Sequence, residues 1–389
     1  METLSQDPTE PKFVQNPYPF YDRARALGPF FHWSDYGMAC APGFEAASLV
    51  LRDRRMGREA PVDGIRDIPD HLAAFYATEA NSMLELEPPS HTRLRGLVLR
   101  AFTSRRVAAL APKIEALCHR LVDAFPRDAS FDLLEAYARP VPVIVIARLM
   151  GLPESRADDL LAWSNAMVGM YQARRTRTME DAAEMATQAF RDFLGVYIAE
   201  KRRVPGDDLI SELIAVEEKG EKLSTEEMIS TCILLLNAGH EATVHTMGNG
   251  VKALLGRDIR EIDAPVIEEI MRFDPPLHIF TRWVYEDLEI LGQSFRRGDR
   301  IACLLGAANR DPAAYAEPDR FLPGRSGPAH LAFGAGIHFC VGAPLARLEM
   351  EIALKILFER CPKLRLTARP RYADLYHFHG LERLDVAAG

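Results

Sequence analysis

The longest apolar stretch of the chain predicts a buried helix. Residues 224–255 begin with Ser224 and Glu227, which have the spacing of a capping box. The stretch continues through CILLLNAG, which is apolar on every face of a helix. Because a helix that is apolar all round crosses the interior of a protein, we expect residues 224–255 to run through the core.

Shorter patterns predict the remaining architecture. Residues 105–125 alternate apolar and charged positions at helical spacing, which predicts a helix with one buried face. Strand-like runs lie at 288–291, 300–305 and 381–386. Without internal repeats or an obvious linker, the pattern predicts a mainly α-helical fold with small β-sheets. We expect one domain over residues 1–389, with a short polar segment over about the first fifteen residues.

The composition excludes several classes of protein. The chain has 389 residues, of which 48% are hydrophobic and 26% charged, as is typical of globular proteins. Its net charge of −8 and its lack of a Lys/Arg block argue against nucleic-acid binding. Six scattered cysteines without a CxxC pair argue against zinc and disulfides. The polar N-terminus has no apolar targeting or membrane-spanning run, so we expect a cytoplasmic protein without a membrane partner.

One cysteine has the surroundings of a metal ligand. Cys340 lies at the end of a loop with three glycines within residues 330–347, and Pro344 opens the helix that follows. Glycines allow the backbone to turn sharply and to approach a flat cofactor closely. The free N–H groups of the helix start are expected to stabilise a thiolate and to lower its pKa. Haem iron uses a lone thiolate as an axial ligand, so the loop predicts a haem site.

The segment FGAGIHFCVG resembles the haem-binding loop of the cytochrome P-450 family of haem-thiolate monooxygenases. The matching positions are Phe333, Gly334, Gly336, His338, Cys340 and Gly342. The resemblance extends from about Asn16 to the end of the chain, and it implies the family's triangular α-rich fold. It implies one haem b (iron protoporphyrin IX), with Cys340 as the iron ligand and Phe333, His338 and Gly342 beside the cofactor.

The resemblance also implies a reaction and its partners. The expected reaction inserts one oxygen atom from O2 into a C–H bond of a small, largely apolar organic substrate. Electrons are expected from a ferredoxin and its reductase. The family's bacterial soluble branch fits best, and a monomer is expected.

A carboxylate and a guanidinium lie three residues apart upstream of the loop. On a helix, Glu269 and Arg272 share one face and can pair. Alone, such a pair is typical of a solvated surface. Here it resembles the family's ExxR pair, completed by an arginine of the later PDRF segment, Arg320. The resemblance implies a structural role for the three residues, which brace the cysteine loop.

Cationic residues at four positions are candidates for the haem propionates. His91 and Arg95 are one helical turn apart, so they can hold one anionic group together. By the same resemblance, Arg282 and His338 are expected to reach the propionates.

The middle of the long apolar stretch resembles the family's oxygen-activating motif, AGxET. Glu241 matches the acid, and Gly239 is expected to let the helix widen over the iron. The family usually has threonine at the next position, where this chain has Ala242. Thr243 follows, but one helical step is about 100° of rotation, so its hydroxyl is expected to point elsewhere. Glu241, Ala242 and Thr243 are the candidate catalytic positions.

Three interpretations of the protein stay open, and the first two are prompted by Ala242. A substrate hydroxyl or an ordered water could supply the missing hydrogen bond, so that monooxygenation continues; the retained acid favours this. Alternatively, the natural reaction could be driven by peroxide. A haem sensor or carrier without activity is the third interpretation, and it leaves the buried acid without a purpose.

Several residues are candidates for contact with substrate. The amide of Asn237 could bind substrate or, equally, its own helix. Residues 61–82 are the expected variable lid, with Phe75 and Tyr76 as aromatic candidates. The candidate pocket residues are Asn237, Ala238, His278, Ile279 and Phe378.

Overall fold

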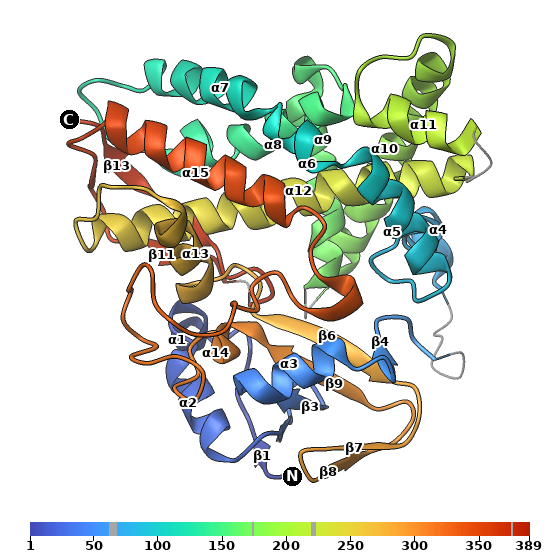
Figure 1. Ribbon diagram of the computed structural model, residues 1–389, viewed down its shortest axis with the longest axis vertical. Helices are drawn as coiled ribbons and strands as arrows, with labels where there is room; N and C mark the ends of the chain where they lie inside the picture. Colours follow the sequence, from blue (N-terminus) through green and yellow to red (C-terminus); the bar gives the residue numbers. More distant parts are fainter. Residues whose placement is uncertain (62–67, 173–174, 219–222, 375) are drawn as a thin grey trace.

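The computed structural model describes residues 1–61, 68–172, 175–218, 223–374 and 376–389. A larger helical part lies above a smaller part that contains most of the β-structure (Figure 1). The α-helices are α1 (Pro11–Gln15), α2 (Tyr18–Ala26), α3 (Phe44–Arg52), α4 (Ala73–Glu79), α5 (Ser90–Ala101), α6 (Ser104–Ala108), α7 (Ala111–Asp123), α8 (Pro140–Met150), α9 (Ala157–Val168), α10 (Arg177–Arg203), α11 (Leu209–Glu218), α12 (Thr225–Leu255), α13 (Ala264–Phe273), α14 (Leu305–Ala308) and α15 (Ala343–Arg360). None of the described helices is long and apolar enough to cross a membrane.

The strands form four sheets in the described part of the chain. The largest has six strands in the order β1-β2-β3-β9-β6-β4, and a three-stranded sheet has the order β10-β13-β5. Two hairpins, β7-β8 and β11-β12, complete the set. The strands are β1 (Thr3–Leu4), β2 (Phe31–Trp33), β3 (Met38–Ala41), β4 (Met56–Gly57), β5 (Phe131–Asp132), β6 (Ile279–Val284), β7 (Leu288–Ile290), β8 (Gln293–Phe295), β9 (Arg300–Leu304), β10 (Arg365–Leu366), β11 (Arg371–Tyr372), β12 (Leu381–Arg383) and β13 (Asp385–Ala387).

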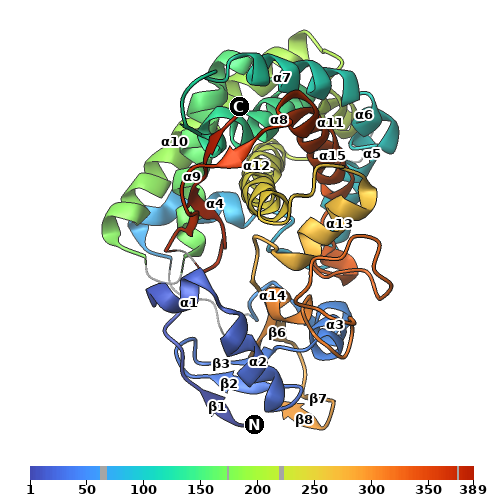
Figure 2. The same cartoon turned by 90° about the vertical axis from the view of Figure 1, so that its left-hand side faces the viewer.

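Helix α12 is the central element of the helical part, as the apolar stretch predicted. Ser224 caps it, and the predicted capping box with Glu227 is present. Figure 2 views α12 nearly end-on, with other helices around it. It contacts α8, α9 and α10 on one side and α13 and α15 on another. The mainly helical fold with small sheets is therefore confirmed.

Two predicted elements are divided in the structure. The predicted helix over 105–125 is split into α6 and α7, because Pro112 in the first turn of α7 lacks the N–H that a continuous helix needs. The predicted strand over 381–386 forms β12 and β13, which belong to different sheets.

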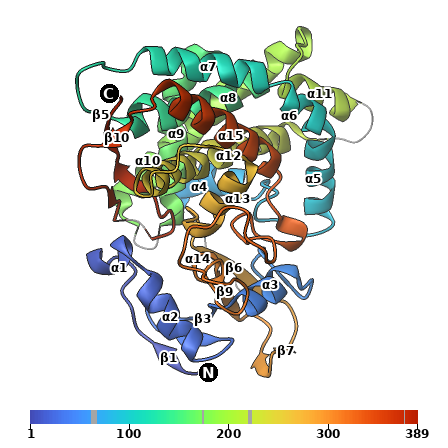
Figure 3. The same cartoon turned by 60° about the vertical axis from the view of Figure 1, so that its left-hand side comes forward.

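The polar N-terminal segment also takes part in the fold. Strand β1 pairs with β2, and α1 buries Phe13 and Val14 beside α2 (Figure 3).

Candidate haem-thiolate site

The cysteine loop has a backbone conformation that strongly favours glycine at two points. Gly334 and Gly336 have φ angles of 70° and 73°, which other residues rarely adopt. A Cβ atom on Gly336 would lie 2.3 Å from the carbonyl oxygen of Leu51, so α3 also approaches the loop closely. The backbone N–H of Cys340 donates to the carbonyl oxygen of Phe333 at 3.0 Å and closes the loop. Helix α15 then begins at Ala343, as predicted.

The electrostatics of Cys340 differ from the expectation. Burial raises the pKa of the Cys340 thiol, and this effect outweighs the lowering by the backbone N–H groups of Gly342 and Ala343 and by the Arg95 guanidinium. The helix start therefore does not produce a thiolate by itself. A coordinating metal ion removes the proton from a thiol, so the same N–H groups would serve a thiolate once iron is bound.

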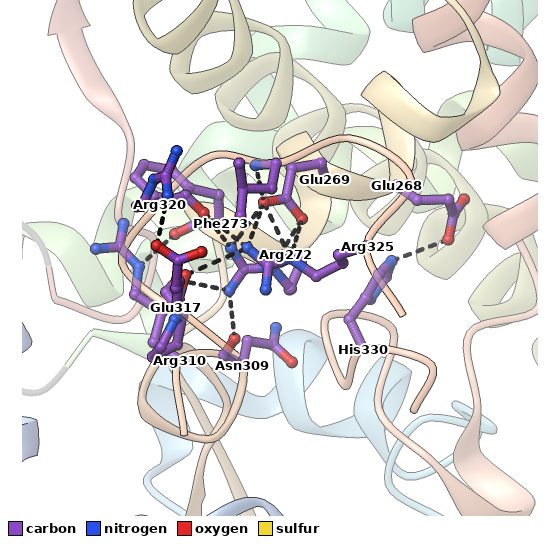
Figure 4. Close-up of polar contacts among 12 residues, drawn as sticks. Glu268, Glu269, Arg272, Phe273, Asn309, Arg310, Glu317, Arg320, Arg325 and His330 are labelled. Atoms are coloured by element: carbon purple, nitrogen blue, oxygen red, sulfur yellow. Dashed lines mark hydrogen bonds and ion pairs between the residues drawn. The ribbon is translucent and has the colours of Figure 1, made fainter. Parts of the chain in front are cut away.

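A buried ion-pair network lies behind the loop (Figure 4). Arg272 donates to both carboxylate oxygens of Glu269 at 2.8 Å, and both side chains are 2% exposed. Arg325 donates to the same carboxylate through Nε at 3.0 Å. Arg272 Nη1 also donates to the carbonyl oxygen of Asn309 at 2.7 Å. Asn309 Oδ1 in turn accepts from the N–H of Leu331, which immediately precedes the cysteine loop, at 2.7 Å.

The structure corrects the third member of this network. The predicted residue, Arg320, is a surface residue whose side chain is 63% exposed and pairs with Glu317. Only its backbone carbonyl takes part, accepting from Arg272 and Arg325 at 3.2 and 2.7 Å. The guanidinium that completes the network belongs to Arg325, five residues later. Sequence reasoning missed Arg325 and Asn309, since spacing alone cannot tell which of two nearby arginines turns inward.

A second connection holds α13 to α15 across the loop. Glu268 accepts from Arg347 Nη2 at 3.1 Å and lies 3.2 Å from His330 Nε2. Burial raises the pKa of Glu268, but His330 and Arg347 outweigh it and lower the pKa to about 2. The carboxylate is therefore ionised and ties together both ends of the 330–347 segment.

The predicted propionate ligands lie on one side of the loop. The rings of His91 and His338 are 4.4 Å apart, and His338 Nε2 lies 2.8 Å from Glu87 Oε1. Arg95 donates to the carbonyl oxygen of Phe339 at 2.6 Å, so it reaches the loop directly. Burial lowers the pKa of His338, with further lowering by Arg282, while Glu87 opposes both.

Several of these polar groups lack partners, and this fits an anionic cofactor. Arg282 is 2% exposed, yet its guanidinium donates only to the carbonyl oxygen of Thr281 and pairs with no carboxylate of the described residues. His91 Nδ1 and Arg58 Nε are also buried without a partner in the described chain. A buried guanidinium without an anion is costly, so the cluster fits the carboxylates of a haem.

The middle of α12 is exposed along one stripe, although helices surround it. Ala238 is exposed, and Asn237, Glu241, Ala242 and His245 are partly exposed. We call these five residues the distal stripe. Their spacing places them on one face of the helix.

Thr243 lies outside this stripe, in agreement with the rotation argument. It is 6% exposed, and its hydroxyl donates to the carbonyl oxygen of Gly239 at 3.4 Å. Gly239 does not widen the helix, because α12 is continuous there. A Cβ at Gly239 would lie 3.2 Å from the Ile146 side chain, so this glycine allows α8 to pack closely.

Glu241 is held between two histidines. Its Oε1 lies 3.1 Å from His245 Nε2, and its Oε2 lies 3.4 Å from His240 Nε2. Burial raises the pKa of Glu241, but the two imidazoles outweigh it and hold the pKa well below its ordinary range. The two histidines were not predicted to take part, because histidines in a helix are usually structural.

The pocket candidates divide into two groups. Asn237 donates to Met167 Sδ at 3.7 Å, and its buried Oδ1 has no partner among the described residues, so no bond to its own helix is formed. Phe378 lies 6.1 Å from the ring of His245, beside the distal stripe. His278 was predicted wrongly: it is fully buried and bonds Tyr21 at 2.7 Å.

Ile279 is similarly buried at 6% exposure, within the main hydrophobic core. The expected lid over 61–82 includes residues 62–67, which lie outside the described part of the chain. Within it, Phe75 is 3% exposed and belongs to the core, while Tyr76 is partly buried. Neither aromatic residue stands free as a lid.

A polar cluster next to this segment was not predicted. Glu79, at the end of α4, accepts from the hydroxyl of Tyr171 at 3.0 Å. Burial and the nearby Glu85 raise the pKa of Glu79 to about 7. Glu85 pairs with Arg58, and the ring of His377 stacks on Tyr171 at 6.2 Å. No sequence motif brings these residues together.

Comparisons with known proteins agree with this site. Residues 264–365, which include Glu269, Arg272 and Cys340, match the family model described as cytochrome P-450. The polyketide biosynthesis cytochrome P-450 PksS of Bacillus subtilis (strain 168) is 34% identical over 100% of this chain and 99% of its own length. The biotin biosynthesis cytochrome P-450 of the same organism is 35% identical over 99% of both chains.

A solved structure agrees equally well. The crystal structure of P450BioI, in complex with an acyl carrier protein that carries hexadec-9Z-enoic acid, superposes with a TM-score of 0.91 at 33% identity. The match covers 97% of this chain and 99% of the other. Full-length similarity at this level, together with the geometry of the cysteine loop, shows that the chain belongs to the cytochrome P-450 family and is a haem-containing monooxygenase.

Proposed function

We propose that residues 1–389 form one catalytic domain that binds one haem b through Cys340 and oxygenates an apolar organic substrate. The observation that carries this proposal is the exposure of the cysteines. Of all six, only Cys340 is partly exposed, while the other five are buried. Cys340 is thus the cysteine with surface that a large cofactor can cover, and it lies in the loop of glycines.

The haem would be held by two sets of residues. Cys340 would bind the iron, with Phe333 and Gly342 beside the ring. The propionates would be held by His91, Arg95, Arg282 and His338. A propionate would stabilise Arg282 most, because its guanidinium pairs with no carboxylate of the described residues. When bound, the haem supplies the thiolate-ligated iron at which dioxygen is activated.

The distal stripe would handle substrate and protons. Glu241 holds an ionised carboxylate beside Ala242. Ala242 leaves room for a substrate hydroxyl or a water at the position that the family usually fills with threonine. Thr243 keeps its hydroxyl on Gly239 and stays out of the pocket. Asn237, Ala238 and Phe378 would contact the substrate.

The substrate class follows from the stripe and from the relatives. The stripe offers an amide, a carboxylate and an imidazole beside two alanines. The relatives' names refer to polyketide biosynthesis and to a fatty acyl chain on a carrier protein. We therefore infer a long acyl or polyketide substrate with few polar groups. A ferredoxin would donate electrons to the monomeric enzyme in the cytoplasm.

The test is turnover with labelled oxygen. The purified holoenzyme is combined with a ferredoxin, its reductase, NADPH, 18O2 and a panel of fatty acids, macrolides and secosteroids. We expect one compound to shift the ferric haem from low to high spin and to gain one 18O atom. Absence of labelled product from every compound that shifts the spin state would contradict the monooxygenase proposal.

Ala242 favours one alternative. Without the usual hydroxyl, coupling of electron transfer to oxygenation could be poor, and hydrogen peroxide could be the natural oxidant. Faster turnover with hydrogen peroxide alone than with ferredoxin and reductase would support this alternative. We favour the ferredoxin-driven reaction because Glu241 is retained and ionised.

A further inference from the structure

Helix α12 carries two histidines beside Glu241. The reaction proposed above uses the acid but neither histidine. We call His240, Glu241 and His245 the carboxylate–imidazole group. Both imidazoles present Nε2 to the carboxylate, at 3.4 Å from His240 and 3.1 Å from His245. These two imidazoles together outweigh the effect of burial on the pKa of Glu241. The group is therefore a local proton system built from one helix.

His240 connects Glu241 with the surface of the protein. Its Nδ1 lies 3.0 Å from the carbonyl oxygen of Leu236, which can only accept. Its Nε2 faces Glu241 Oε2 and, at 3.4 Å, Asn165 Oδ1. With the Asn165 amide oriented in this way, both ring nitrogens face acceptors. His240 therefore lies between Glu241 and Asn165, and Asn165 is exposed to solvent.

His245 has the opposite arrangement. Its Nε2 donates to Glu241, but its buried Nδ1 has no partner in the described chain. A Cβ at Gly380 would lie 1.8 Å from this Nδ1, so the C-terminal turn presses against the ring. A buried acceptor without a partner costs about 1–3 kcal/mol. Such a cost is typical of a residue retained for function.

Resting on the proposed function, we propose that His245 replaces the missing hydroxyl at position 242 as the positioning residue for proton supply. His245 and Ala242 share the distal stripe, three residues apart, so the imidazole occupies the face that lacks the hydroxyl. His245 holds the Glu241 carboxylate on that face.

The balance of the reaction requires a renewable proton source. Each turnover consumes one O2, two electrons from the ferredoxin and two protons; one oxygen atom enters the C–H bond and the other leaves as water. The protons leave through Glu241. In this proposal they are replaced from solvent on the side of His240 and the exposed Asn165.

A double-mutant cycle tests this role. His245→Ala is made in the wild type and in Ala242→Thr, and oxidised product per NADPH is measured with hexadec-9Z-enoic acid as probe. We expect a loss of roughly tenfold or more in the wild type, since general acid–base groups contribute at least that much. In the threonine background the loss should shrink to about twofold, because the hydroxyl takes over. Equal losses in both backgrounds, or no loss, would overturn the proposal. His119→Ala, at an exposed position on α7, is the matched control.

A second readout does not depend on turnover. In the reduced carbonyl complex of the holoenzyme, the infrared C–O stretch reports the polar groups that surround the ligand. His245→Ala and Glu241→Gln should both shift this band, and His119→Ala should not. An unshifted band in His245→Ala would overturn the role of His245, whereas shifted bands without any oxidised product would count against the proposed function alone.

Discussion

The two sides of the candidate site are built in contrasting ways. On the cysteine side, Glu269 and Arg272 are almost completely buried, and every oxygen of the carboxylate has donors. On the α12 side, the distal stripe is partly exposed and contains polar atoms without partners, such as Asn237 Oδ1 and His245 Nδ1. A saturated network holds one geometry, whereas unsatisfied groups remain available to a ligand. Under the proposed function, the cysteine side would therefore hold the haem in place, and the α12 side would act on oxygen and substrate.

The largest effect should come from opening the saturated network. Arg272→Ala leaves the Glu269 carboxylate buried beside one guanidinium instead of two, and breaking such a pair costs about 3–5 kcal/mol. We expect severe loss of haem incorporation, measured as haem absorbance per protein. Arg325→Ala should cause a smaller loss, and Arg320→Ala, at the surface, should behave like the wild type. A loss of haem incorporation in Arg320→Ala without a loss in Arg325→Ala would contradict the structure.

The acid of the distal stripe should have the next largest effect, and it should act on catalysis alone. Glu241→Gln keeps the shape of the side chain but removes the carboxylate. We expect kcat to fall by about 100-fold, within the range of general acid–base contributions, with unchanged haem content. A normal kcat would show that the stripe does not supply protons.

Replacing Ala242 with the threonine that is usual in the family tests what occupies this position of the α12 side. Ala242→Thr adds a hydroxyl to the stripe. If a water fills that position in the wild type, the product formed per NADPH should rise a few-fold, which corresponds to a free-energy difference of less than about 1.4 kcal/mol. A fall in activity would indicate that a substrate group occupies the space. Product per NADPH, with hydrogen peroxide release as the complement, distinguishes these outcomes.

A further effect concerns stability and not catalysis. The pKa of Glu79 is raised from 4.5 to about 7, so the folded state binds more protons than the unfolded state between these values. Stability should fall as the pH rises through this window, by about 3 kcal/mol at most. Thermal unfolding of Glu79→Gln between pH 5 and 8 should lack this decrease. Parallel pH profiles of the wild type and the variant would contradict the assignment.

The sequence predicted the site where backbone conformation and helical periodicity determine it. The glycines of the cysteine loop, the capped helix α12 and the pairing of Glu269 with Arg272 all depend on local spacing. The rotation of about 100° between Ala242 and Thr243, which turns the Thr243 hydroxyl away from the stripe, also follows from helical periodicity alone. These features need no knowledge of distant contacts.

Features that depend on tertiary contacts were missed or misplaced. Arg320 and Arg325 have the same chemistry, and only the fold shows that Arg325 turns toward Glu269. His278 was assigned to the pocket from its position in the chain, but the buried Tyr21, more than 250 residues away, holds it elsewhere. The Glu79–Tyr171 contact joins α4 to a segment that follows α9, which no local pattern encodes.

The most direct test of the account is the carbon monoxide difference spectrum of the reduced protein. We predict the red-shifted Soret band of thiolate-ligated haem in the wild type and in Cys303→Ser, where a buried cysteine outside the loop is replaced. Cys340→Ser should lose that band. A thiolate-type band that persists in Cys340→Ser would contradict the assignment of Cys340, and with it the division of the site into a positioning side and a reacting side.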